Sequence, residues 1–231
     1  MYNRDYLTDN SSSHSNESSQ AYLISFLKAT YQLFAGSLLA ATAGAYIGLG
    51  LVHFIAGPMM WVLFAIELAL IFFVIPRVKH TPGVNLAVLF AFTFITGLTI
   101  APLLTSIFAM PGGASIVGQA FLMTSIAFGG ISMFAMTTKK DFSFMGKFLF
   151  IALIIMIVAG ISNIFIQSSM MQLVIASAGA LLFSAFILYD TQNIIKGNYD
   201  SPVEAALSLY LDFFNLFISL LQILGIMKNN E

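Results

Sequence analysis

The sequence predicts an all-α integral membrane protein that crosses the bilayer seven times. Hydrophobic residues make up 59% of its 231 residues and charged residues only 8%, and the mean hydropathy is +0.93. Because soluble domains carry roughly one-quarter charged residues, this composition is typical of a chain embedded in lipid. Stretches of about 17–25 apolar residues suffice to cross a bilayer as helices, and the sequence contains seven. A closed β-barrel would show short alternating segments instead.

The seven predicted helices are separated by linkers rich in helix-breaking residues. In chain order we expect the helices at 29–51, 58–76, 84–109, 115–137, 144–167, 170–192 and 203–227. Proline and glycine punctuate the linkers, at Gly57-Pro58, Thr81-Pro82-Gly83, Pro111-Gly112-Gly113 and Ser201-Pro202. Residues 28–231 therefore form one predicted membrane domain.

Residues 1–27 differ in composition from the rest of the chain. The run from Asn10 to Gln20 is polar and too poor in apolar residues to fold alone. We therefore expect a flexible polar cytoplasmic tail. It lacks the basic and apolar regions of a cleaved signal peptide, so we expect the first helix to direct insertion.

The basic residues predict the orientation. With the N-terminus inside, eight of the nine fall on the cytoplasmic side and only Lys228 falls outside, which is a positive-inside pattern. The eight are Arg4, Lys28, Arg77, Lys79, Lys139, Lys140, Lys147 and Lys196. Seven crossings then place the C-terminus outside.

Charge, cysteine content and motifs exclude several functions. A net charge of −1 argues against nucleic-acid binding, which needs a basic face. Because the chain has no cysteine, disulfides, thiol nucleophiles and cysteine metal sites are excluded. The three histidines lie in the tail and loops without metal-ligand spacing, and the motifs of metalloproteases, P-loop proteins, dinucleotide-binding proteins and serine hydrolases are absent. We therefore expect neither an enzyme nor a bound cofactor.

Three acidic residues lie in the interior of predicted membrane helices, away from the helix ends: Glu67, Asp190 and Asp212. A carboxylate in mid-membrane costs about 2.5–3.5 kcal/mol on insertion scales, so such residues usually face protein or water and serve a function. Asp190 and Asp212 flank one short loop and lie roughly 9–15 Å deep from the same side. Since helices joined by a short loop are antiparallel neighbours, we expect the two carboxyl groups to meet. The alternative is that all three acids are neutral and satisfy nearby polar groups.

Polar residues also follow two helix faces. In the last helix Ser208, Asp212, Asn215, Ser219 and Gln222 advance by four or three residues, which places them on one face. Such a stripe lines a hydrated path or forms hydrogen bonds between helices. In the third helix Thr96 and Thr99 precede Pro102, which removes a backbone hydrogen bond. We expect Thr96, Thr99 and the polar residues of the last helix to line a pore.

Small residues predict close packing of the first helix. Gly36, Ala40, Gly44 and Gly48 recur every four residues and let another backbone approach.

An aspartyl-protease interpretation fits poorly. Two membrane aspartates are found in intramembrane proteases, in which a shared proton activates water, and Tyr189-Asp190 matches the first presenilin-type motif. The second motif needs glycines just before the aspartate, whereas Leu209-Tyr210-Leu211 precedes Asp212, and the Pro-Ala-Leu motif is absent.

Four motifs, in the same order along the chain, resemble those of the Bax inhibitor-1 family. The resemblance covers all seven predicted helices and excludes only the tail. The four motifs are Thr96-Gly97-Leu98-Thr99-Ile100-Ala101-Pro102, the stretch 136–143 (Met-Thr-Thr-Lys-Lys-Asp-Phe-Ser), Tyr189-Asp190-Thr191-Gln192, and the stretch 206–217 (Ala-Leu-Ser-Leu-Tyr-Leu-Asp-Phe-Phe-Asn-Leu-Phe). The short loops and tail resemble prokaryotic members, which implies the bacterial cytoplasmic (inner) membrane.

The resemblance implies a fold and a function. It implies a central C-terminal helix wrapped by the other six, and a pH-sensitive calcium leak governed by a di-aspartyl pair that Asp190 and Asp212 match. Arg77 resembles the family arginine that engages the pair, and Glu67 resembles an acid on the same helix. Bacterial members are also linked to regulation of a membrane-bound ATP-dependent protease. The alternative is therefore a non-conducting membrane regulator that binds and modulates such a protease or a stress-response partner.

The chemistry of the predicted pair agrees with a leak. Two nearby carboxyl groups in a low dielectric do not both ionise easily, and they titrate as a unit. Calcium prefers several oxygen ligands, so Asp190 and Asp212 are also a predicted transient calcium site.

Overall fold

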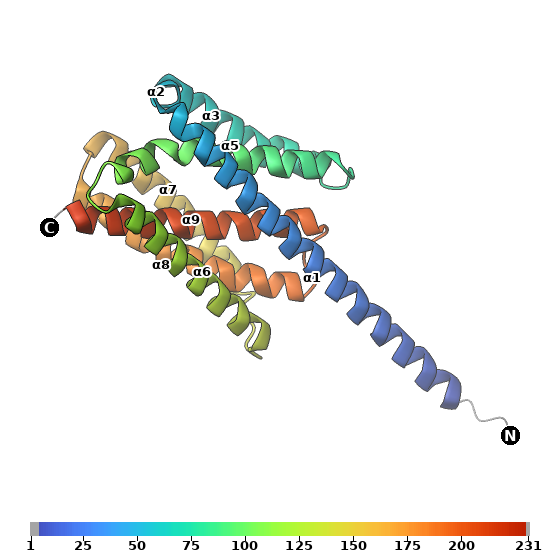
Figure 1. Ribbon diagram of the computed structural model, residues 1–231. Coiled ribbons are helices and arrows are strands. Elements are labelled where there is room, and N and C mark those ends of the chain that lie inside the picture. Colours follow the sequence, from blue (N-terminus) through green and yellow to red (C-terminus); the bar gives the residue numbers. More distant parts are fainter. Residues whose placement is uncertain (1–4, 230–231) are drawn as a thin grey trace.

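The computed structural model describes residues 5–229, with side chains from Gln20 onward, as a helical bundle (Figure 1). Its elements are α1 (Asp5–Gly50), α2 (Val52–Ile55), α3 (Pro58–Ala69), the π-helical turn η1 (Leu70–Val74), α4 (Ile75–Val78), α5 (Val84–Phe108), α6 (Gly113–Thr137), α7 (Met145–Ile166), α8 (Ser169–Ile195) and α9 (Pro202–Asn229). Within the described residues, seven helical segments are long and apolar enough to cross a membrane. The prediction of seven transmembrane helices is therefore confirmed.

The predicted helix ends agree with the structure to within three residues, except at the first helix. Phe26, three residues before the predicted start at residue 29, is already buried in the core. The helix itself extends back to Asp5, through the segment expected to be a flexible tail. Neither proline nor glycine occurs between Asp5 and Ala35, so nothing in the chain interrupts a helix that starts in the bundle. In Figure 1 the start of α1 projects away from the other helices.

Helix α9 lies at the centre of the bundle, as expected (Figure 1). It packs against α8, α1, α6 and α5, and its fully buried side chains include Leu209, Tyr210 and Leu221. The other two spans lie further out, because α7 packs mainly on α8 and the α3–η1–α4 segment packs on α5. The central helix is therefore enclosed by an inner ring of four helices rather than equally by all six.

The first and third spans approach each other through glycine, as the small-residue pattern predicts. A Cβ atom added at Gly44 would lie 2.1 Å from the Phe94 carbonyl oxygen, and one added at Gly97 would lie 2.0 Å from the Ala41 carbonyl oxygen. Both distances are far below van der Waals contact, so only glycine permits this backbone separation. Close approach of this kind gives membrane helices dispersion contacts where the hydrophobic effect does not drive association.

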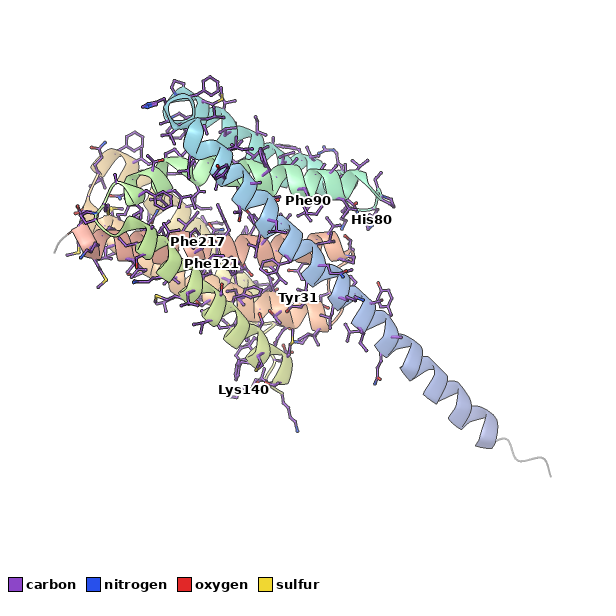
Figure 2. All side chains as sticks on the ribbon, viewed as in Figure 1. Tyr31, His80, Phe90, Phe121, Lys140 and Phe217 are labelled. Carbon is purple, nitrogen blue, oxygen red and sulfur yellow. The ribbon has the colours of Figure 1, made fainter. Side chains whose placement is uncertain are left out.

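Phenylalanine side chains fill the space between the inner helices. Phe34 of α1 stacks on Phe128 of α6 with ring centroids 4.9 Å apart, and Phe213 of α9 meets Phe128 edge to face at 5.6 Å. Phe121 and Phe217, labelled in Figure 2, form a further edge-to-face pair between α6 and α9. Such aromatic pairs add about 0.5–1.5 kcal/mol each beyond the area that they bury.

One end of the bundle carries most of the basic residues and is called the basic end below. It comprises Arg77 and Lys79 after η1, the α6–α7 loop with Lys139 and Lys140, Lys147 of α7, and Lys196 at the end of α8. The short loop between α8 and α9 lies at this end. The aspartates of α8 and α9 therefore lie nearest to this end.

Candidate functional site: the di-aspartyl pair

Asp190 and Asp212 meet between α8 and α9, as the sequence predicts. Asp190 lies five residues before the end of α8, and Asp212 lies ten residues after the start of α9. Only six residues link the two helices, so the helices pack antiparallel. The two carboxyl groups are within hydrogen-bonding contact of each other. Their residues are only 7% and 4% exposed, which makes this a buried acidic pair.

Neutral polar groups surround Asp190. Its carboxyl group lies in contact with the side chains of Tyr199, Ser208, Asn193 and Asp212. The Tyr199 hydroxyl also donates to Ser208 Oγ at 2.9 Å. In contrast, the Oδ2 atom of Asp212 is buried without a hydrogen-bond partner among the described residues. A buried unpaired oxygen is costly unless it carries or meets a proton or a cation, so the pair is poised to bind one.

The sequence analysis missed two members of this site, Tyr199 and Asn193. Asn193 lies three residues after Asp190, so it shares a helix face with it. Tyr199 lies in the loop that joins the two aspartate-bearing helices, a position from which a long side chain can fold back onto the pair. Both signals are present in the sequence, and they become recognisable once Asp190 and Asp212 are known to meet.

The polar stripe of α9 follows one side of the helix away from the pair. Ser208 contacts Asp190, and Ser219 faces α8, since its Oγ atom would lie 2.7 Å from a Cβ atom at Gly179. Asn215 is half-buried and donates to the Leu211 carbonyl oxygen of its own helix at 2.7 Å. Each of these side chains therefore lies in a helix interface or on its edge in this conformation.

The stripe ends at a polar cleft of about 270 Å³ at the opposite end of the bundle. Gln222 lines this cleft together with Asn163 of α7 and Gln172 of α8. The Asn163 side-chain amide donates to Gln172 Oε1 at 3.4 Å. The stripe thus connects the buried acids with an amide-lined opening, and Ser219 is packed tightly between them.

The threonines expected to line a pore do not join the aspartates. The Thr99 hydroxyl donates to Glu67 Oε1 at 2.9 Å, and the Thr96 hydroxyl hydrogen-bonds with the hydroxyl of Tyr210. Tyr210 is fully buried. Because it is two residues from Asp212, it points to nearly the opposite side of α9. Glu67, Thr96 and Thr99 thus form a second polar cluster, between α3, α5 and α9.

Arg77 lies away from the pair in this structure. Its guanidinium donates to the Phe73 carbonyl oxygen and lies 6.0 Å from the centre of the Phe73 ring. The arginine side chain thus folds back along its own segment, onto the residue four positions earlier. The side chains in contact with the two aspartates do not include Arg77. An Arg77 ion pair with the aspartates would need a different conformation.

Two lysines at the basic end form ion pairs with acidic residues of the loops. Lys79 Nζ lies 2.5 Å from Asp200 Oδ2 and 4.0 Å from Glu204 Oε2, and the hydrogen bond from Lys79 lowers the pKa of Asp200. Lys196 pairs with Asp141 of the α6–α7 loop, and its hydrogen bond lowers the pKa of that carboxyl group. Burial and then the nearby Asp190 raise the pKa of Tyr199. At neutral pH the ion pairs are therefore charged, and the tyrosine hydroxyl remains a hydrogen-bond donor.

The described residues hold no group of three or more His, Cys, Asp or Glu side chains arranged to bind a metal ion. At the pair, a cation would meet two carboxylates together with neutral oxygens such as those of Ser208 and Tyr199. Calcium sites normally use six to eight oxygen ligands. This donor set therefore fits a passing cation better than a firmly bound one.

Seven spans around a central helix, with a carboxyl pair shared by the last two, define a multi-pass helical membrane protein with an intramembrane acidic site. Residues 23–230 match the family model described as inhibitor of apoptosis-promoting Bax1. The chain therefore belongs to the Bax inhibitor-1 family.

The family includes relatives of similar length from bacteria and animals. A Campylobacter jejuni protein is 52% identical over 227 residues, which cover 97% of this chain and 96% of that protein. A Vibrio cholerae membrane protein is 41% identical, covering 89% of this chain and 91% of its own. The mouse protein lifeguard 4 is 35% identical, covering 87% and 84%.

Proposed function

We propose that this protein is a pH-sensitive calcium leak of the bacterial inner membrane, gated by Asp190 and Asp212, and that it is not an enzyme. The observation that carries the proposal is the contact between two buried carboxyl groups on adjacent helices, one of which has an unpaired oxygen. The bacterial relatives support the location. The basic end, by the positive-inside rule, supports a cytoplasmic position for the aspartates.

The proposed gate works through the number of protons on the pair. With one proton, the carboxyl groups share a hydrogen bond that holds α8 against α9. When both groups ionise, their repulsion in a low dielectric favours separation of the helices or entry of a cation. The polar stripe from Ser208 to Gln222 then offers oxygen atoms along the interface between α9 and its neighbours. Ser219 is buried at the interface with α8, which supports a closed path in this conformation.

Calcium flux into liposomes that contain only this protein tests the proposal. Purified protein is reconstituted into liposomes that enclose a calcium-sensitive dye. The dye fluorescence is followed after calcium is added outside the liposomes at a series of pH values. We expect flux above that of protein-free liposomes, with a rate that depends on pH. Flux equal to that of empty liposomes at every pH would reject conduction.

The alternative is a non-conducting regulator that binds a membrane protein such as an ATP-dependent protease. Two observations support this alternative function. The start of α1 projects beyond the bundle (Figure 1). The description of the family model concerns inhibition of a protein rather than transport. The projecting helix offers a surface for a partner. In this case flux in liposomes would be absent while a cellular effect persists.

Deletion of residues 1–19 separates the two functions. The deletion leaves the described core intact, since Phe26 is the first described residue that is buried in it. We expect liposome flux within about twofold of the full-length rate, because terminal segments outside a packed core contribute little to it. Loss of flux in a truncated protein that still elutes as a folded species would show that the segment belongs to the conducting unit. A lost cellular phenotype with intact flux would support a partner at this helix.

A further inference from the structure

The loop between α8 and α9 lies directly over the acidic pair and is held at several points. The plug segment, defined here as residues 197–201, has the sequence Gly-Asn-Tyr-Asp-Ser. Asn198 and Asp200 are exposed, whereas Tyr199 between them is half-buried. Its hydroxyl reaches inward to Ser208 and Asp190. The tyrosine is thus the residue of the loop that covers the aspartates from the basic end.

Each residue of the plug segment after its glycine has its own anchor. The Asn198 amide donates to Asn193 Oδ1 at 2.9 Å, and Asn193 in turn contacts Asp190. Ser201 Oγ accepts from the backbone amide of Val203 at 3.1 Å, which fixes the start of α9. Gly197 has φ of 71° and ends α8 in a left-handed turn. That turn is a natural hinge, because glycine adopts both signs of φ at little cost.

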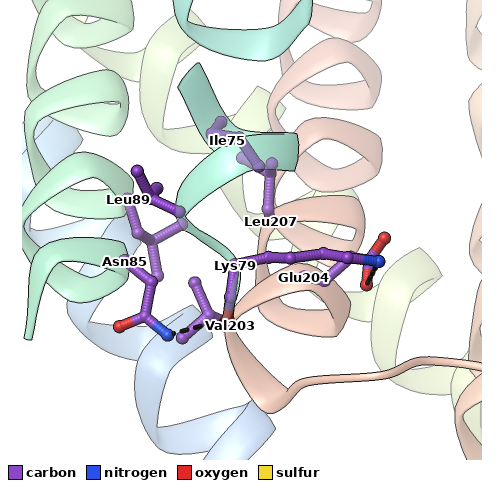
Figure 3. A pocket seen from close by; sticks show the side chains of 8 residues that line it. Ile75, Lys79, Asn85, Leu89, Val203, Glu204 and Leu207 are labelled. Atoms are coloured by element: carbon purple, nitrogen blue, oxygen red, sulfur yellow. Dashed lines mark hydrogen bonds and ion pairs between the residues drawn. The ribbon is translucent and has the colours of Figure 1, made fainter. Parts of the chain in front are cut away.

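The anchor at Asp200 comes from a different part of the bundle. Lys79, just after α4, extends across the first turn of α9, with its ammonium group beside Glu204 (Figure 3). The same ammonium group forms the 2.5 Å ion pair with Asp200. Its side chain is 26% exposed and that of Asp200 is 60% exposed. The second membrane span therefore holds the loop that covers the aspartates through an ion pair that solvent can reach.

We infer that residues 197–201 form a plug that closes the cytoplasmic access to the di-aspartyl pair, with Tyr199 as the occluding side chain and Lys79 as its latch. Release of Lys79 from Asp200 lets the segment turn about Gly197 and withdraws Tyr199 from Ser208 and Asp190. The importance of this plug for ion flow rests on the proposed leak function. The closure of access to the pair does not depend on that function.

A single cysteine beneath the plug tests this inference, because the chain has no cysteine of its own. Ala205 is fully buried and lies three residues before Ser208 and seven before Asp212, on the same face of α9. The variant Ala205→Cys is treated with a charged thiol reagent that does not enter lipid, and the labelling rate is measured. We expect slow labelling in the otherwise unchanged protein.

Variants of the latch and the plug should raise the labelling rate. We expect an increase of about fivefold for Lys79→Glu, since it replaces a part-exposed ion pair by repulsion, and about tenfold for Tyr199→Ala, which removes the cover and its hydrogen bonds. Combining Lys79→Glu with Asp200→Lys restores a charge pair and should restore slow labelling. In the unchanged background, labelling should become faster as salt screens the pair.

Two controls separate a local opening from a general loosening. Lys147→Glu makes the same charge change at the same end of the bundle, in the first turns of α7, and should leave labelling of Ala205→Cys unchanged. Ala176→Cys is a buried position on α8 far along the helix from Asp190, and Lys79→Glu should not expose it. Unchanged labelling at Ala205→Cys, or an equal rise at both cysteines, would overturn the plug. A rise at Ala205→Cys alone, without calcium flux in liposomes, would support the plug and reject the leak.

Discussion

Replacing either aspartate of the pair with asparagine is expected to remove most of the pH dependence of calcium flux. In the unchanged protein one shared proton can change flux by up to about tenfold per pH unit, the limit for a single titrating step. In Asp190→Asn and in Asp212→Asn we expect a change of less than about twofold across the same range. The double variant should add little to either single variant, because both residues act in one hydrogen-bonded unit. Flux measured in liposomes over a pH series checks this.

These variants should fold, which keeps the test interpretable. The amide group introduced by Asp190→Asn can accept from Ser208 and donate to the Asp212 oxygen that has no described partner. Asp141→Asn is the matched control, since it removes an exposed carboxylate at the basic end, and its pH profile should stay normal. If the single variants of the pair keep a normal profile, the carboxyl groups are structural and the sensor proposal fails.

The second large effect is expected on stability, at the contact between α1 and α5. Gly97→Ala and Gly44→Ala each place a methyl group about 2 Å from a backbone carbonyl oxygen of the facing helix, so the two helices must separate. Overpacking of this kind costs about 1–3 kcal/mol, and backbone atoms cannot rotate away as side chains do. We expect a clearly lower unfolding temperature for each variant in detergent, measured by circular dichroism.

The matched control for this contact is Gly130→Ala in α6. An added Cβ atom there meets nothing within 4 Å, and alanine favours a helix over glycine by up to about 1 kcal/mol. Its unfolding temperature should be unchanged or higher. The double variant of Gly44 and Gly97 should lose less than the sum of the single losses, because the first substitution already widens the shared interface. Equal effects at Gly97 and Gly130 would mean that the close approach is unimportant.

Much of the fold could be predicted from local sequence because the bilayer imposes strict rules. Apolar length fixes each span, and proline and glycine fix the linkers, so most predicted helix ends lie within three residues of those observed. The early start of α1 was missed because the prediction relied on hydropathy. Polar residues beyond an apolar span can continue a helix when no residue breaks it.

The candidate site was predictable in part for a similar reason. Two carboxyl groups inside apolar helices are too costly to be accidental, and a short loop makes their helices neighbours, so the meeting of Asp190 and Asp212 followed from the chain. The same reasoning could not predict the contacts of Thr96 and Thr99. Helical periodicity shows which residues share a face, but it does not show which other helix that face packs against. The structure places them with Tyr210 and Glu67, on the side of α9 away from Asp212.

The sequence by itself determined the class of protein, the spans, the glycine contact surface and the acidic pair. Each of these depends on spacing along one helix or across one short loop. Only the tertiary structure decided that Tyr199 covers the pair, that Lys79 reaches Asp200 from 121 residues away, and that Arg77 turns back to Phe73. These contacts depend on how distant helices rotate and pack against one another, and that rotation is set by the whole core rather than by any local pattern.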